Sequence, residues 1–332
     1  MQIEAADEQC ALGQFIPAHY HHNMLMDGNR MRSFRSAIEY AVRPGAKVLE
    51  LGGGTGVLSW FAAAKAEKVW CVEFNPEMVA SARAMLAMNP HGERVEVVQA
   101  DAFHYLPPEP VDVVICEMLY TAMLREKQLE LIESFKRRYL ARFGGALPVF
   151  LPEAVIMAVQ PVQQNYHFSG FHAPIIEFQP AGADMSATRE IAPPAVYAIV
   201  DFNQTNDATI TWDGKCVVEA NGTVNALRFI TKNVLAIVGA ANTTIDWLNH
   251  FMVLPLDRPV LVKAGDVLSV SFQYRAGASI PSLQASLHAG LIYPVARQAP
   301  AQRLACPAPG RTRQLAAARP AALPCRRAPP AG

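Results

Sequence analysis

The sequence lacks the cysteine spacing of a structural metal site. None of its six cysteines forms a Cys-x-x-Cys pair within the 332 residues, although paired cysteines at that spacing are the usual signature of bound zinc. Cys71 and Cys116 lie inside apolar runs, where a small buried hydrophobic residue is the ordinary case. We therefore expect no metal ion, and we expect reduced thiols with a structural role.

Long apolar runs and a net charge are missing as well. The most apolar segments, such as Val234–Val238, are far shorter than the roughly 20 residues that a helix needs to cross a bilayer. The first residues carry acids where a secretory signal would carry lysine or arginine. Lysine plus arginine and aspartate plus glutamate number 29 each, so no broad cationic field attracts nucleic acid. We expect a cytoplasmic protein without membrane contacts and without a strong nucleic-acid signal.

Residues 30–150 alternate short apolar runs with stretches of helical periodicity. Such alternation predicts an α/β fold in which a doubly wound, Rossmann-like parallel sheet is flanked by helices. The runs expected to be strands are Lys47–Leu51, Val69–Phe74, Val95–Gln99, Val111–Cys116 and Ala146–Phe150.

After Pro152 apolar and polar residues alternate, as they do in Val267–Tyr274. Strands with this pattern have one buried face and one solvent-exposed face. Residues 151–292 are thus predicted to form a mainly antiparallel β-barrel or sandwich, which would be the substrate domain. Residues 293–332 are rich in alanine, proline and arginine, so we expect a disordered basic tail. Such a tail could be merely solvated, could contact RNA or acidic proteins, or could result from a shifted reading frame.

A glycine-rich loop follows the first run, with the sequence Glu50-Leu51-Gly52-Gly53-Gly54-Thr55-Gly56. Glycines let the backbone and a ligand approach where a Cβ would collide, and the position between a strand and a helix is typical of nucleotide binding. A dinucleotide fingerprint would need glycine where the chain has Val57. The observed spacing therefore indicates a different nucleotide ligand.

Two further acids stand at the ends of the next two runs. Glu73 ends the second run, and Asp101 follows the third. An acid at the first of these places can accept hydrogen bonds from both hydroxyls of a ribose, and ligands of open α/β sheets collect at such strand ends. Together with Glu50 these acids would repel a pyrophosphate. They favour a ligand with a sugar, an adenine and a cationic sulfonium.

This combination of loop and acids resembles the class I S-adenosylmethionine-dependent methyltransferases. The resemblance implies S-adenosyl-L-methionine as the cofactor. It implies that the glycines pass the methionine part, that the acid after the second run holds the ribose, and that the residues after the third run flank the adenine. The cofactor-binding residues implied in this part of the chain are Glu50, Gly52, Gly54, Gly56, Glu73, Asp101 and Ala102.

A pair of glutamates follows the fourth run. Glu117 ends that run, and Glu126 is the next acid in the chain. Methyl transfer to oxygen or to an ordinary amine needs no such pair, whereas an arginine guanidinium presents a planar fork of donors and stays protonated. Paired carboxylates bind it bidentately and polarise it. The pair therefore predicts catalytic roles for Glu117 and Glu126 toward a guanidino group. The alternative for Glu126 is that it only caps or solvates the start of the helix that follows it.

Residues 15–292 as a whole resemble the protein arginine methyltransferases. His21–Arg30 is similar to the family's helix before the cofactor domain, so residues 1–29 are expected to form an N-terminal helical segment over the cofactor site. The resemblance implies that Met24 faces the guanidinium beside the cofactor and that Arg30 pairs with the cofactor carboxylate. His250 stands where the family has its Thr-His-Trp loop, which implies that it orients a glutamate or takes part in proton loss.

The resemblance also implies that protomers pair as a homodimer through an arm from the barrel, for which residues 168–194 are the candidate. The predicted function is an S-adenosylmethionine-dependent methyltransferase that acts on a guanidino or other nitrogen of a protein. A small-molecule N- or O-methyltransferase is the alternative, favoured by Met118, which stands where the family usually has tryptophan. A non-catalytic binding module is a third possibility, against which the glycine loop and Glu73 argue.

Overall fold

The computed structural model of the chain describes residues 18–292. The predicted basic tail, 293–332, lies outside these residues, as does the segment 1–17. No helix within 18–292 is long and apolar enough to span a membrane.

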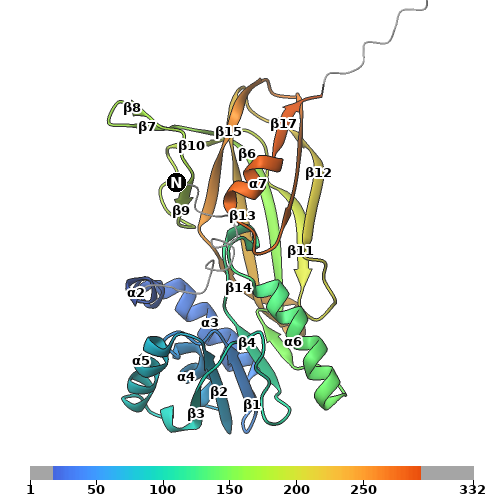
Figure 1. The fold of residues 1–332 in the computed structure, drawn as a ribbon. Coiled ribbons are helices and arrows are strands. Elements are labelled where there is room, and N and C mark those ends of the chain that lie inside the picture. The colour runs from blue at the N-terminus through green and yellow to red at the C-terminus, as the bar shows by residue number, and fades with distance from the viewer. Residues whose placement is uncertain (1–17, 293–332) are drawn as a thin grey trace, which may run out of the picture. The chain divides into compact units, whose positions relative to one another are not determined.

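A parallel sheet in the order β3-β2-β1-β4-β5 forms the first part of the structure (Figure 1). Successive strand residues point to opposite faces, so β1 directs Val48 to one face and Leu49 to the other. Val48 packs in a cluster with Phe34 of α3, whereas Leu49 packs with Ile132 of α6. Helices thus cover both faces, and the predicted doubly wound sheet is confirmed. The elements are α2 (Ala18–Met26), α3 (Gly28–Ala41), β1 (Lys47–Leu51), α4 (Val57–Ala63), β2 (Lys68–Glu73), α5 (Pro76–Ala87), η1 (Gly92–Arg94), β3 (Val95–Gln99), β4 (Val113–Cys116), η2 (Thr121–Met123), α6 (Gln128–Phe143) and β5 (Val149–Leu151).

Antiparallel strands form the second part. Along one sheet the order is β10-β6-β13-β15-β9, with β11 paired to β6 and β14 to β13; a second sheet has the order β12-β16-β17, and β7 pairs with β8 in a hairpin. The predicted antiparallel β-rich region is therefore confirmed. Its elements are β6 (Ala154–Gln164), β7 (His167–Phe168), β8 (Phe171–His172), β9 (Glu177–Gln179), β10 (Thr188–Glu190), β11 (Ala195–Asp201), β12 (Thr209–Val217), β13 (Gly222–Val238), η3 (Gly239–Ala241), β14 (Thr243–Leu248), β15 (Phe251–Val262), β16 (Val267–Arg275), α7 (Ile280–Ser286) and β17 (His288–Leu291).

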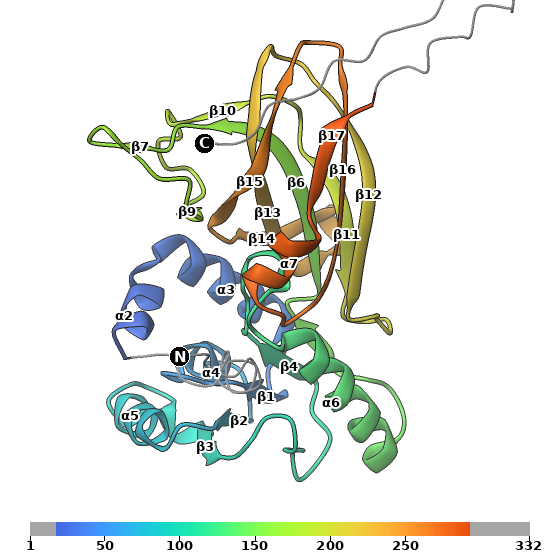
Figure 2. The same cartoon turned by 45° about the horizontal axis from the view of Figure 1, so that its top comes forward.

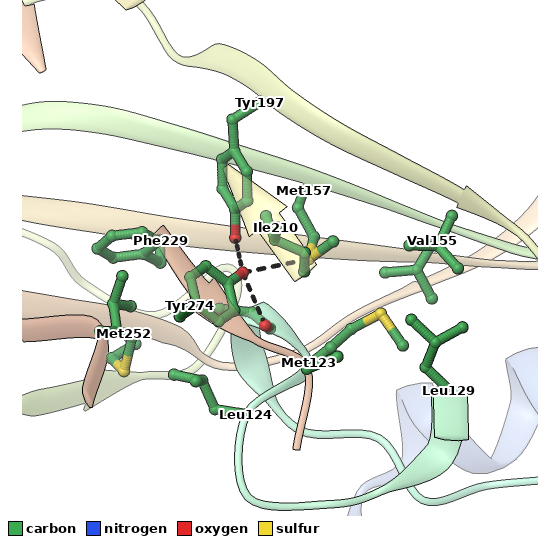
Figure 3. Packing of buried hydrophobic residues seen from close by; sticks show 14 of the residues in the cluster. Met123, Leu124, Leu129, Val155, Met157, Tyr197, Ile210, Phe229, Met252 and Tyr274 are labelled. Carbon is green, nitrogen blue, oxygen red and sulfur yellow. Dashed lines mark hydrogen bonds between the residues drawn. The ribbon is translucent and has the colours of Figure 1, made fainter. Parts of the chain in front are cut away.

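Aromatic side chains fill the interior between the two larger antiparallel sheets. The Phe272 ring of β16 contacts the rings of Tyr197, Phe229 and Tyr274. The same buried cluster continues through Leu124 and other residues of the β4–α6 connection to the parallel sheet (Figure 3). Burial of this apolar surface stabilises both parts together. The domain boundaries after residues 29, 150 and 292 stay predictions.

Candidate active site

A cavity of about 660 Å³ opens at the carboxyl ends of β1, β2 and β4. Ligands of open α/β sheets collect at this edge. The loops after these strands, helices α2 and α3, and one face of α6 line the cavity. Every predicted site residue except Gly56 and His250 is among the lining residues, which include Met24, Arg30, Glu50, Gly52, Gly54, Glu73, Asp101, Ala102, Glu117 and Glu126.

The glycine loop forms the floor of the cavity. Gly52 and Gly54 have φ angles of +78° and +51°, in the left-handed region that favours glycine. A Cβ at Gly54 would lie 2.9 Å from the His21 ring, and one at Gly53 would collide with the Cys71 sulfur. Gly56 serves the fold instead, because it precedes α4 with a φ of +77° and faces Leu86.

Two acids hold this loop and the helix that follows it. Glu50 is buried and accepts hydrogen bonds from the Ser59 hydroxyl and from the Ser59 backbone N–H, the latter at 2.9 Å. Burial raises the pKa of Glu50 to about 8. Glu73 accepts hydrogen bonds from the backbone N–H groups of Gly54 at 2.9 Å and Asn75 at 2.8 Å. Glu50 thus holds the start of α4 to the end of β1, Glu73 holds the backbone of the loop, and both acids line the cavity.

Asp101 and Ala102 line the far end of the cavity. Asp101 accepts a hydrogen bond from the Phe103 N–H at 2.9 Å and lies 2.7 Å from the His104 ring nitrogen Nδ1. These contacts close a tight turn after β3. The turn presents its backbone and one carboxylate to whatever occupies the cavity.

Arg138 of α6 also lines this end, although its position in the sequence carries no signal of a binding role. One nitrogen donates to the Tyr105 carbonyl at 3.1 Å. Its Nε and Nη2 atoms are buried and have no hydrogen-bond partner among residues 18–292. Burial lowers the pKa of Arg138, and Asp101 opposes this shift. Because buried donors without partners are costly, Arg138 is suited to bind a ligand with acceptor atoms.

Arg30 and Glu117 form an ion pair at the opposite end. Their side chains are only 10% and 12% exposed, and the Arg30 guanidinium lies 5.1 Å from the centroid of the Trp247 ring. The sequence did not predict this pair, because the partners are far apart in the chain. Burial raises the pKa of Glu117, while Arg30 opposes that shift. Arg30 thereby compensates the charge of one of the two predicted catalytic glutamates.

Glu126 lines the same end of the cavity and has no such compensation by a direct ion pair within the described part of the chain. Burial and the neighbouring charge of Glu117 raise the pKa of Glu126 to about 8. At neutral pH this carboxyl is therefore largely protonated. An entering cation would favour its ionised form.

His250 lies elsewhere. Its side chain is exposed and does not line the cavity, and its backbone carbonyl accepts a hydrogen bond from the Thr121 hydroxyl at 2.7 Å. The structure thus does not bring the His250 ring together with Glu117 and Glu126. The geometry supports a role for the His250 backbone in holding the loop between β4 and α6, through Thr121.

His21 is a cavity residue that the sequence reasoning did not select. Its ring lies over Gly54, and burial lowers its pKa, against the opposing effect of Glu73. The sequence signal was its place one helical turn before Met24, on the segment predicted to cover the site. No group of three or more histidine, cysteine, aspartate or glutamate side chains in 18–292 is arranged to hold a metal ion.

Comparisons with known proteins agree with this geometry. A family model described as a methyltransferase domain matches residues 48–141. An uncharacterised protein of Methanocaldococcus jannaschii is 27% identical over 268 residues, which are 81% of this chain and 96% of that protein. Protein arginine N-methyltransferase 10 of Arabidopsis thaliana is 33% identical over 150 residues, which are 44% of this chain and 38% of that protein.

Two solved structures share the fold. The PRMT1 enzyme–prozyme heterotetrameric complex of Trypanosoma brucei with AdoHcy gives a TM-score of 0.62 at 20% identity, covering 76% of this chain and 86% of that chain. Arabidopsis thaliana protein arginine methyltransferase 10 gives 0.64 at 18% identity, covering 80% of this chain and 89% of that chain.

The fold, the glycine loop and the methyltransferase-domain match define the class: the chain is a class I S-adenosylmethionine-dependent methyltransferase. Within that class it resembles the protein arginine methyltransferases in sequence and in fold.

Proposed function

We propose that the protein transfers a methyl group from S-adenosyl-L-methionine to a guanidino nitrogen of a protein arginine. One observation carries the proposal. Glu126 lies beside Glu117 in the cavity, and Glu117 is already compensated by Arg30. The carboxylate of Glu126 is therefore available to pair with a bound acceptor that carries a positive charge, and a guanidinium is such an acceptor.

The residues present fit the cofactor. Gly52 and Gly54 adopt the left-handed backbone that glycine favours, a Cβ at Gly54 would lie 2.9 Å from the His21 ring, and Glu73 stands at the strand end where a ribose is held. Arg30 keeps its buried Nε without a hydrogen-bond partner in 18–292, so it has a donor for the cofactor carboxylate besides those used on Glu117. Asp101 and Arg138 offer an acceptor and donors to the adenine. The cofactor supplies an activated methyl group on a sulfonium.

The chain contributes orientation and electrostatics. Binding of a cationic guanidinium displaces the proton of Glu126, and the resulting carboxylate fixes the acceptor. Glu117 holds the second edge of the guanidinium while Arg30 keeps Glu117 ionised and in place. The acceptor nitrogen would lose one proton as it gained the methyl group, and the Glu126 carboxylate beside it would take up that proton. No strong base is needed, because a thioether is a good leaving group.

A small-molecule N- or O-methyltransferase is the second candidate, and Glu126 itself favours it. A carboxyl group with a pKa of about 8 is suited to take a proton from a neutral hydroxyl or amine near neutral pH. Met118 on the cavity wall leaves the acceptor side without the aromatic residue expected at that position.

Apolar side chains on the β7–β8 hairpin support pairing of protomers. This hairpin extends away from the larger sheets (Figures 1 and 2) and exposes Phe168 and Phe171, the latter at 71%. Helix α2 exposes Leu25 and Met26 in turn. We propose that the hairpin of one protomer covers such a surface on its partner, which sedimentation of wild type and of the Phe171→Ser variant tests.

Methyl transfer to peptides tests the proposed function. Wild-type protein is incubated with labelled cofactor and an arginine-rich peptide, or with the same peptide in which lysine replaces every arginine. We expect label in the arginine peptide alone. Equal labelling of both peptides, or labelling of neither while a small molecule from host extract is labelled, would reject the guanidino acceptor.

A further inference from the structure

The loop that carries Glu126 has a costly backbone. Ala122, Met123 and Arg125 have φ angles of +58°, +52° and +62°, a region that residues with a side chain rarely adopt. Such conformations persist only where the surrounding structure enforces them. Contacts from outside the loop must therefore determine where Glu126 stands.

The β-rich part supplies these contacts. Hydrogen bonds from four places on its strands and their ends reach the loop. Four of these bonds engage backbone atoms on both sides of Met123, and the fifth engages the Thr121 hydroxyl. The bonds are Tyr274 hydroxyl to Ala122 carbonyl at 2.9 Å, Ala122 N–H to Thr231 hydroxyl at 2.8 Å, Thr121 hydroxyl to His250 carbonyl at 2.7 Å, Gly277 N–H to Met123 carbonyl at 2.8 Å, and Arg125 N–H to Ala278 carbonyl at 2.8 Å.

Tyr274 is special among these groups because its hydroxyl reaches the loop from the aromatic core. The side chain is 4% exposed, and its oxygen lies 3.0 Å from the Tyr197 hydroxyl and 3.8 Å from the Met157 sulfur (Figure 3). Burial raises the pKa of both tyrosines, so the pair stays neutral. Rigid packing around the ring gives the hydroxyl little freedom.

We propose that Tyr274 is a positioning residue for methyl transfer, which holds the Ala122 carbonyl and through the strained loop fixes Glu126 against the acceptor. The inference rests on the proposed function. Tyr274 touches neither cofactor nor acceptor, since it does not line the cavity. Its effect is geometric, and a displacement of about 1 Å in a catalytic group can lower a rate by roughly a hundredfold.

Tyr197 provides a matched control. Tyr197→Phe and Tyr274→Phe each remove one hydroxyl from the same buried pair, but only Tyr274→Phe removes a hydrogen bond to the loop. A merely structural pair predicts equal effects of the two substitutions. A positioning role predicts that the two variants lose similar thermal stability and differ in turnover.

The first measurement compares turnover on the arginine-rich peptide with affinity for S-adenosylhomocysteine in full-length protein. We expect kcat to fall by about tenfold or more in Tyr274→Phe and by at most about twofold in Tyr197→Phe, with unchanged affinity in both. Equal kcat values in the two variants would overturn the proposal, as would a loss in Tyr274→Phe that lies wholly in cofactor affinity.

The second measurement needs no acceptor. Hydrogen exchange in the segment 118–127 is expected to accelerate by about fivefold or more in Tyr274→Phe and to stay near wild type in Tyr197→Phe. If Tyr274→Phe does not fold, Thr231→Val replaces it, because Thr231 accepts the hydrogen bond from the same Ala122. Hydrogen exchange at the wild-type rate in the loop variant would refute the positioning role of Tyr274, even if the protein transfers methyl groups to arginine. Absence of transfer by wild type would refute the proposed function and leave exchange to decide the role of Tyr274.

Discussion

Replacement of Glu126 by glutamine removes the charge that the proposed mechanism requires while it preserves the size of the side chain. Glu117 already pairs with Arg30 in a buried ion pair, so the carboxylate of Glu126 is the one left for an incoming cation. Glu126→Gln would leave a bound guanidinium without that partner in a largely buried site.

The size of the effect follows from this burial. Breaking a buried pair by removing one partner costs about 3–5 kcal/mol, and 3 kcal/mol corresponds to roughly a hundredfold in rate. We therefore expect kcat/KM for an arginine peptide to fall by about a hundredfold or more. Affinity for S-adenosylhomocysteine should hardly change, because Glu126 lies on the acceptor side.

The pH dependence gives the prediction a second signature. The pKa of Glu126 is raised to about 8 without acceptor, so at lower pH the proton must leave before a cation binds. Wild-type kcat/KM should rise about tenfold per pH unit below pH 8 and level off above it. Glu126→Gln should lose this limb, because an amide does not titrate.

Glu130→Gln is the matched control, since Glu130 also lines the cavity but is exposed. Its kcat/KM should stay within about threefold of wild type. Activity of Glu126→Gln within about threefold of wild type, with the acid limb retained, would refute the double-carboxylate mechanism.

The remaining predictions concern stability and the cofactor. The partly buried Glu126 carboxyl keeps its proton in the folded protein up to about pH 8, whereas the unfolded chain loses that proton from pH 4.5 upward. The free energy of unfolding of wild type therefore falls over this pH range relative to that of Glu126→Gln. The melting temperature of the variant should rise relative to that of wild type up to about pH 8 and then keep a constant difference, about 2–4 °C for each kcal/mol relieved. In calorimetry, Glu73→Ala should weaken S-adenosylhomocysteine binding by about 1–3 kcal/mol, whereas exposed Glu77→Ala should not; equal affinities would reject the ribose contact. Arg138→Met should weaken S-adenosylhomocysteine binding by a similar amount. Arg142→Met removes a comparable hydrogen bond from α6 to a backbone carbonyl and should leave this affinity unchanged. Equal losses of affinity in the two variants would mean that Arg138 serves the fold alone.

The sequence predicted the elements that depend on local periodicity. The run Lys47–Leu51 is β1 to the residue, and the alternation in Val267–Tyr274 became β16 with buried even-numbered positions. Glycine spacing and strand-end acids located most of the cavity for the same reason, because parallel strands bring their carboxyl ends together.

Tertiary contacts between distant segments could not be predicted in this way. The Arg30–Glu117 pair joins α3 to the end of β4, and the hydrogen bond from the Tyr274 hydroxyl to the Ala122 carbonyl joins β16 to the loop before α6. Arg138 lines the cavity because α6 packs into the same buried cluster as the strands of the parallel sheet. These features depend on how elements pack, whereas periodicity describes each element alone.

The acceptor atom tests the central claim most directly. Protein from a host lysate is labelled by the wild-type enzyme with isotopic cofactor, digested and analysed by tandem mass spectrometry. The account predicts labelled methyl groups on guanidino nitrogens of arginine, and on these only when Glu126 is intact. Label confined to small molecules, or to residues other than arginine, would contradict it.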